Sequence, residues 1–210
     1  MTTVTSKIER PAIWLIAALA LFALHLAPWA AHHSAALTQS AHDLAISTRF
    51  TPGAGQFRAE LFLLPAWCAG WILAALAGAA IGGPRRMLLM LLAVGCIAYT
   101  LPEYPRYLQP EFRTQTVLAV LAGVLALIAF WLRSRALPAR MLLLANLAIG
   151  PMLVVPLFGL WWVRQPLTAL LGSPVVPGWG WWGTVAFVGI VMSVAFIRLL
   201  KFNTSTATLG

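Results

Sequence analysis

The sequence predicts an all-helical (all-α) polytopic integral membrane protein, with about six transmembrane helices and a short amphipathic helix on the outer surface between the first two. The 210-residue chain is 61% hydrophobic and 9% charged, and its mean hydropathy is +0.87. Its apolar runs are about 20 residues long, which is the length that a helix needs to cross a bilayer. Lipid offers no partners to free backbone groups, so these runs must be helical. They also lack the polar–apolar alternation of barrel strands.

A single membrane domain is expected over residues 1–210. The apolar runs are separated by glycines, prolines and arginines, as in GGPRR at 82–86 and RSRALPAR at 133–140. Gly and Pro stop helices, and Arg is costly in hydrocarbon. The first run follows Lys7 and Arg10 like a signal peptide, but it is long enough to span, so we expect it to be retained as a helix. The predicted spans are 11–31, 57–81, 84–104, 114–132, 141–163 and 178–200.

The amphipathic helix is predicted over about residues 35–50. Leu37, Ala41, Leu44 and Thr48 recur at helical spacing and form one stripe. Polar side chains occupy much of the remaining surface, and the following TPGAG segment ends the helix. A helix with this pattern is typical of a membrane surface.

The charged residues predict the orientation of the chain. With the N-terminus inside, nine of the 14 Lys and Arg residues fall in inner segments, and four of the five acids fall in outer ones. By the positive-inside rule, both termini are expected in the cytoplasm, with the chain in the inner (plasma) membrane. The basic excess then faces an anionic leaflet, so no nucleic-acid partner is needed to explain it.

The outer loop carries most of the histidines and suggests an external metal site. Imidazole and carboxylate groups are competent metal ligands. The sequence has no HExxH motif and no paired CxxC motif, so a solvated loop is the alternative. The candidate ligands are His32, His33, His42 and Asp43, with Glu60 and Glu103 as further carboxylates.

His25 is the histidine predicted to lie within a span. An intramembrane histidine can ligate heme or a chlorophyll-type pigment, or can hydrogen-bond a neighbouring helix. A bis-histidine heme needs a second buried histidine, and the other three fall in the adjoining loop, which favours the hydrogen bond. Tryptophans and tyrosines at the outer span ends are typical of an aromatic belt, although they could also line a quinone or pigment site.

The fifth predicted span is the candidate for a substrate site. Gly150 and Pro151 fall near the bilayer midplane, and Asn146 could bond a carbonyl that proline leaves free. Pro65 lies in the second span, so a broken helix in each half of an inverted repeat would suit a small transporter or channel for a neutral or hydrophobic solute. A plain proline kink is the simpler interpretation.

Small residues recur every fourth position at Ala74, Gly78 and Gly82, and again at Ala119 and Gly123. This spacing lets helix backbones approach closely, either within the chain or against a partner subunit. From the sequence, both uses stay open.

The remaining chemistry-bearing residues do not form a catalytic motif. Cys68 and Cys96 stand apart without a CxxC motif, which favours buried structural thiols. No Asp, Glu, Lys or Arg falls at the midplane of a predicted span, whereas ion pathways and proton relays need buried ionisable groups. We therefore expect a non-catalytic accessory, scaffold or assembly subunit of a larger respiratory, photosynthetic or transport complex, with other membrane subunits and lipids as its partners. The sequence requires no cofactor. The alternatives are the transporter described above and a heme-, pigment- or quinone-associated redox protein that uses His25.

Overall fold

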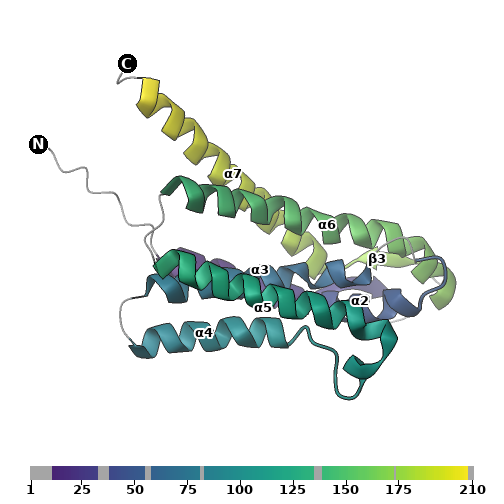
Figure 1. Ribbon diagram of the computed structural model, residues 1–210. Helices are drawn as coiled ribbons and strands as arrows, with labels where there is room; N and C mark the ends of the chain where they lie inside the picture. Colours follow the sequence, from purple (N-terminus) through teal and green to yellow (C-terminus); the bar gives the residue numbers. More distant parts are fainter. Residues whose placement is uncertain are drawn as a thin grey trace, which may run out of the picture.

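The computed structural model describes residues 11–32, 38–54, 58–80, 83–134, 139–172 and 174–207, without the side chains of 134–147, 195 and 198–207. The chain is mostly helical, at 82%. Its longer helices are α1 (Pro11–Leu26), α3 (Leu64–Ala79), α4 (Gly83–Ala98), α5 (Arg113–Ser134), α6 (Ala139–Leu171) and α7 (Trp179–Ala207) (Figure 1). The shorter elements are α2 (Ala41–Phe50), three 3-10 turns, η1 (Ala59–Leu63), η2 (Arg106–Leu108) and η3 (Pro110–Phe112), and three strands, β1 (Pro28–His32), β2 (Thr38–Ser40) and β3 (Val175–Pro177).

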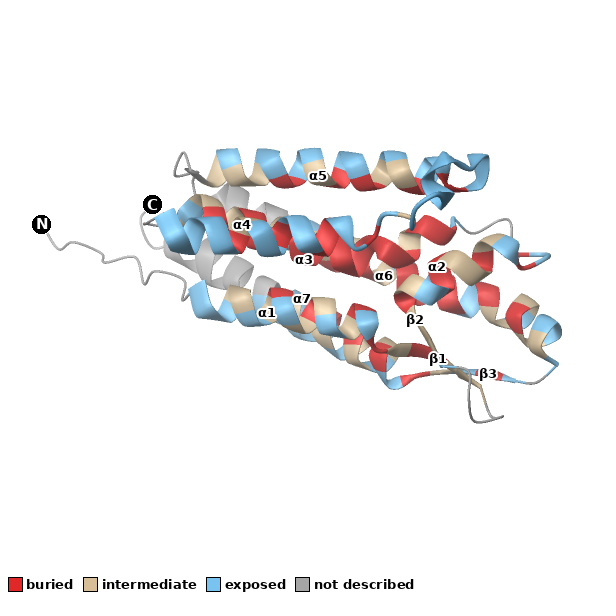
Figure 2. Ribbon diagram, turned by 90° about the horizontal axis from the view of Figure 1, so that it is seen from below, coloured by how far each residue is buried: buried red, intermediate tan, exposed pale blue. Residues whose placement is uncertain are grey.

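Helix α3 is the centre of the bundle and packs against α1, α4 and α5. Its residues are apolar on all sides and most of them are buried, which is the pattern of a helix enclosed by other helices. Figure 2 shows the contrast with α4 and α5, which expose their outward faces. Helices α6 and α7 pair with each other, and α7 also contacts α1.

Three helical stretches are long and apolar enough to cross a membrane, namely Ala59–Ala79, Pro110–Arg133 and Ala148–Leu171. Helix α1 and the segment Trp179–Val194 are apolar but shorter. A 16-residue helix such as α1 is only about 24 Å long, whereas the hydrocarbon core is about 30 Å thick. These helices fit a membrane-protein fold, with three candidate spans among the described residues.

A small antiparallel sheet in the order β2-β1-β3 was not predicted, so the expectation of an entirely helical chain was wrong in this respect. The sequence of β1, PWAAH, has neither the alternation nor the β-branched residues of a typical strand. Its strand conformation depends on pairing with chain segments on both sides. The amide of Gly178 donates to the carbonyl of Trp29 (2.7 Å). A side chain at Gly178 would collide with the backbone of Pro28, so glycine is required there.

The helix predicted over 35–50 is observed as α2, which begins at Ala41. The Ser40 side chain accepts from the Asp43 amide (3.2 Å), and the Asp43 carboxylate accepts from the Ser40 amide (2.9 Å). This reciprocal capping box defines the first turn, because it satisfies amides that have no partner within the helix. Leu44 and Thr48 of the predicted stripe are buried. The start of the stripe, Leu37, lies outside the described residues.

The fifth predicted span is not broken at its prolines. Helix α6 continues through Pro151 and Pro156, since an internal proline removes a single amide and neighbouring turns can absorb a kink. Pro65 lies in the first turn of α3, where proline fits a helix without disruption. Pro65 of α3 and Pro151 of α6 therefore do not occupy matching mid-helix positions. This removes the argument for an inverted repeat of broken helices. Gly150 lies against the side chain of Met192 in α7.

The structure separates the two small-residue motifs. Gly78 faces α5, and a side chain there would collide with the backbone carbonyl of Phe130. Gly123, on α5, has open space where a side chain would project. Gly78 thus serves packing within the chain, whereas Gly123 leaves a smooth outer face. Gly82, the last residue of the first motif, lies outside the described residues.

We expect Gly78→Val to separate α3 from α5 and to lower the stability of the detergent-solubilised protein by roughly 1–3 kcal/mol, the usual cost of overpacking. The measurement is thermal unfolding followed by circular dichroism. The matched control, Gly123→Val, places the same side chain in open space and should leave the midpoint nearly unchanged. Equal losses in the two variants would contradict the assignment of Gly78 to the helix contact.

Candidate functional site

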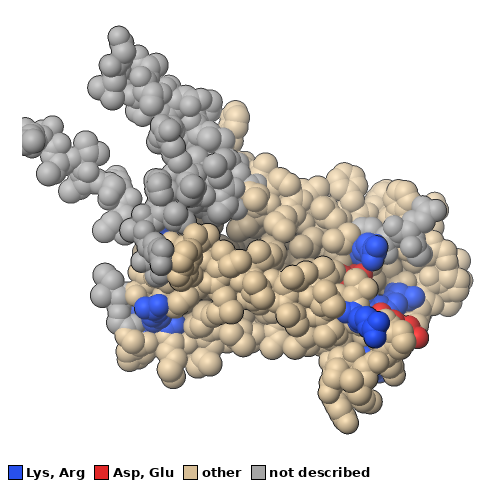
Figure 3. All heavy atoms as spheres, viewed as in Figure 1, with Lys and Arg blue, Asp and Glu red and all other residues tan. Residues whose placement is uncertain are grey.

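Polar groups gather at the end of the bundle that carries α2 and the sheet. In Figure 3 the Lys and Arg side chains lie at both ends of the face shown, whereas Asp and Glu appear only near this end. The acids here come from α2, η1, η3 and the loop after α4, as Asp43, Glu60, Glu111 and Glu103. This end of the molecule holds three features that could take part in binding or chemistry: a buried ion-pair network, a histidine pair and a surface pocket.

The network begins with an ion pair between Arg49 of α2 and Glu60 of η1, whose closest atoms are 2.9 Å apart. The two side chains are only 10% and 8% exposed. Arg49 also donates to the amide oxygen of Gln115 on α5 (3.1 Å) and lies over the ring of Phe112 at 4.4 Å. A charge pair shielded from water needs these extra hydrogen bonds to offset its desolvation.

The network continues into the centre of the bundle through Gln115, which is almost fully buried. Its amide donates to the carbonyl of Thr100 after α4 (2.7 Å). The Thr100 hydroxyl accepts from the indole N–H of Trp67 on α3 (2.8 Å) and donates to the carbonyl of Ile97 (2.6 Å). Side chains from α2, η1, α3 and α5 are therefore tied together. Glu60, considered above as a metal ligand, instead binds Arg49.

The histidine pair consists of His25 on α1 and His42 on α2. His25 is fully buried, and the two ring centroids are 6.3 Å apart. Tyr99 lies beside both rings, with its centroid 4.9 Å from His42 and 6.1 Å from His25. Within the described part of the chain, the nitrogens Nδ1 and Nε2 of His25 and Nδ1 of His42 are buried without a hydrogen-bond partner. Unpaired buried nitrogens are costly, so the pair is a candidate for a binding site.

The sequence analysis treated His25 and His42 as members of two different sites. The structure brings them together because the β1–β2 pairing reverses the chain and α2 then packs against α1. Burial lowers the pKa of His42 below its usual value, while Asp43 and Glu103 act in the opposite direction. Spacing along the sequence carries no signal for this pair, since a strand pairing and a helix packing intervene between its members.

The other predicted site residues are not gathered around this pair. His32 lies in β1, and His33 lies outside the described residues. Among the residues that the structure describes, no three His, Cys, Asp or Glu side chains form a group that could hold a metal ion. The four-residue external metal site stays a prediction. The side chain of Asn146 is likewise outside the described part, while Gly150 and Pro151 lie within α6.

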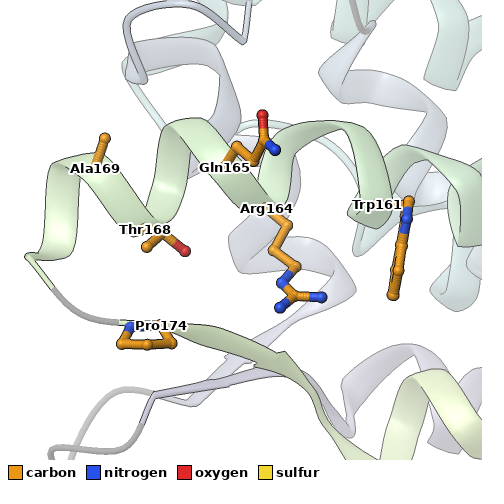
Figure 4. Close-up of a pocket in the computed structure, with 6 residues that line it drawn as sticks. All are labelled: Trp161, Arg164, Gln165, Thr168, Ala169 and Pro174. Atoms are coloured by element: carbon orange, nitrogen blue, oxygen red, sulfur yellow. The ribbon is translucent and has the colours of Figure 1, made fainter.

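A pocket of about 620 Å³ lies beside the C-terminal part of α6, next to β3 (Figure 4). Arg164 and Thr168 point toward β3, and Gln165 also lines the pocket. The guanidinium of Arg164 lies 5.1 Å from the ring centroid of Trp161. The Thr168 hydroxyl accepts from the Val175 amide (3.2 Å) and keeps its own proton to donate. A guanidinium and a hydroxyl facing one space can bind an anionic group. The sequence analysis did not single out Arg164.

We expect Arg49→Met to destabilise the protein by about 3 kcal/mol or more, because Glu60 would stay buried without its partner. Chemical denaturation in detergent, followed by tryptophan fluorescence, measures the change. The double variant Arg49→Met/Glu60→Gln removes both charges and should recover part of the loss. A double variant that is no more stable than the single one would show that the charge pair itself contributes little.

Comparisons with protein-family models, with curated proteins and with solved structures found no match to this chain. Its function is therefore inferred from its own side chains, namely the network, the histidine pair, the pocket and the exposed loop that follows α4.

Proposed function

We propose that the chain is a non-catalytic integral membrane subunit that docks a partner subunit of a larger respiratory, photosynthetic or transport complex. The observation that supports this most is the loop between α4 and α5, residues 101–112, which projects from the bundle (Figure 1). Tyr104 is 79% exposed and Leu108 is 70% exposed. Large apolar side chains held out from a protein surface mark interaction sites.

The composition of this loop suits a protein partner. Tyr104 and Tyr107 lie with their rings 5.8 Å apart and form one aromatic surface. Glu103 and Arg106 stand exposed beside them. Aromatic residues and arginine are enriched at the energetic centres of protein interfaces. We therefore propose a partner membrane subunit that presents an apolar groove with charged edges at the outer surface.

A supporting role agrees with how the buried polar groups are used. In the network, Arg49, Glu60, Gln115 and Thr100 bond to one another and so hold elements together. The continuous helix α6 offers the transporter alternative no unwound segment near Gly150. A site for moving a solute through broken helices is therefore less well supported than a docking role.

The proposed topology has six crossings, with both termini in the cytoplasm of a bacterial cell and the end bearing α2 outside the inner membrane. The charge asymmetry along the sequence supports this orientation, since Arg85 and Arg86 lie at one end of α4 and Glu103 follows the other. The helices α1 and α4 are shorter than the hydrocarbon core is thick. Local thinning of the bilayer or interfacial side chains would make up the difference. Helix α2 would then lie at the outer membrane–water interface.

This topology predicts which sites a membrane-impermeant thiol reagent can reach in intact cells. In a background without Cys68 and Cys96, we expect Thr38→Cys to be labelled and Ser134→Cys to be protected until the cells are opened. Thr38 is exposed and precedes the capping residue Ser40, so the substitution spares the α2 cap. Labelling at 134 together with protection at 38 would show that the chain has the opposite orientation.

The docking role predicts a stoichiometric partner after gentle solubilisation, detected by native electrophoresis and native mass spectrometry. The double variant Tyr104→Ser/Leu108→Ser should lose that partner while the subunit itself stays folded, because both side chains are exposed. The control Val176→Ser changes an exposed apolar residue of β3 and should keep the partner. Wild-type protein that migrates alone, at 22.7 kDa plus detergent, would overturn the proposal.

A further inference from the structure

The buried nitrogens of His25 and His42 lack partners that a folded protein normally provides. Three ring nitrogens of the pair are buried without a hydrogen bond among the described residues. A buried polar atom without a partner costs about 1–3 kcal/mol. Such a cost is tolerated where a ligand supplies the missing interactions, so the pair calls for an occupant that binds imidazole nitrogen.

The separation of the rings narrows the choice of occupant. Their centroids are 6.3 Å apart. With roughly 1 Å from each centroid to its nitrogens, a direct N–H···N hydrogen bond of about 3 Å would need the rings closer together. An ion between the two rings, at about 2 Å from a nitrogen of each, reproduces a separation near 6 Å. A bridging water also fits this distance and is the competing occupant.

The surroundings of the pair favour a small ion with few ligands. The ring of Phe22 lies 6.3 Å from that of His25 and 5.8 Å from that of Tyr99. The rings of Phe22 and Tyr99 therefore pack around His25. Within the described residues, no third His, Cys, Asp or Glu joins them to complete a metal-binding group. Zinc takes four ligands in structural sites, and two imidazoles supply only half of that number.

The charge of the ion follows from burial. The cost of burying an ion rises steeply with its charge, so a monovalent ion is favoured at His25, which is fully buried. Among the metals that bind imidazole, copper has a monovalent state. We infer that His25 and His42 bind one cuprous ion between them, with Tyr99 covering the site. This inference goes beyond the docking role and does not depend on it.

The test is an anaerobic titration of the purified full-length protein with Cu(I), in competition with the chromogenic chelator bicinchoninate. Cys68 and Cys96 are first replaced by alanine, because thiols also bind Cu(I). This background should remove one Cu(I) per chain from the dye. His25→Leu and His42→Leu should each weaken binding by more than about tenfold. His32→Leu, a histidine of the same outer region, should bind as the background does.

Spectroscopy and folding controls make the outcomes decisive. Copper K-edge absorption of the loaded protein should show two nitrogen ligands, and the spectrum should be lost in His42→Leu. Should His25→Leu fail to fold, the half-buried His42 carries the test, with monodispersity as the check. No capture from the dye would leave water as the occupant and overturn the inference. Capture that depends on His32, or tighter binding of Zn²⁺ by the same pair, would overturn it as well.

Discussion

The buried ion pair between Arg49 and Glu60 connects the α2 end of the molecule to the helical bundle. Two opposite charges held away from water are stable only when every remaining donor and acceptor is engaged. Here Gln115 completes the coordination of Arg49 and passes the connection on to Thr100. Because this arrangement fixes α2 against η1 and α5, it also determines where His42 lies relative to α1. The histidine pair is thus a consequence of the way in which a surface helix is anchored.

The bundle beneath this cap follows a different rule. Hydrophobic force does not favour contact between helices in lipid, so close approach and van der Waals packing must hold them together. Helix α3 meets this requirement with small residues, and Gly78 allows the backbone of α5 to approach. Rings fill the wider gaps, as where the Trp71 indole donates to the carbonyl of Ala122 on α5 (2.9 Å). The proposed membrane location and the observed packing are consistent on physical grounds, since α3 is enclosed and α5 exposes apolar side chains.

The features that could take part in binding lie at one end of the molecule. They differ in how many of their polar atoms have hydrogen-bond partners within the chain. The Arg49 network is self-contained, which supports a structural role. The Arg164 pocket and the loop carrying Tyr104 face outward and are open to lipids or a partner. The histidine pair has buried ring nitrogens without hydrogen-bond partners among the described residues, which is the condition that favours a bound ion. A docking subunit that also holds a copper ion would combine an exposed contact surface with a buried site, and the two can be tested separately.

The sequence by itself determined the helical character of the chain, its division into apolar runs and the stop signals between them, because hydropathy and Gly or Pro positions act locally. The start of α2 at Ala41 was not predicted, because the stripe from Leu37 indicated an earlier one. Only the tertiary structure decided the rest. The strand at Pro28–His32 exists through pairing with β2 and β3, and α6 passes its prolines because its other turns keep their hydrogen bonds. His25 and His42 meet because a chain reversal and a helix contact bring them together, and neither is encoded in the spacing between them.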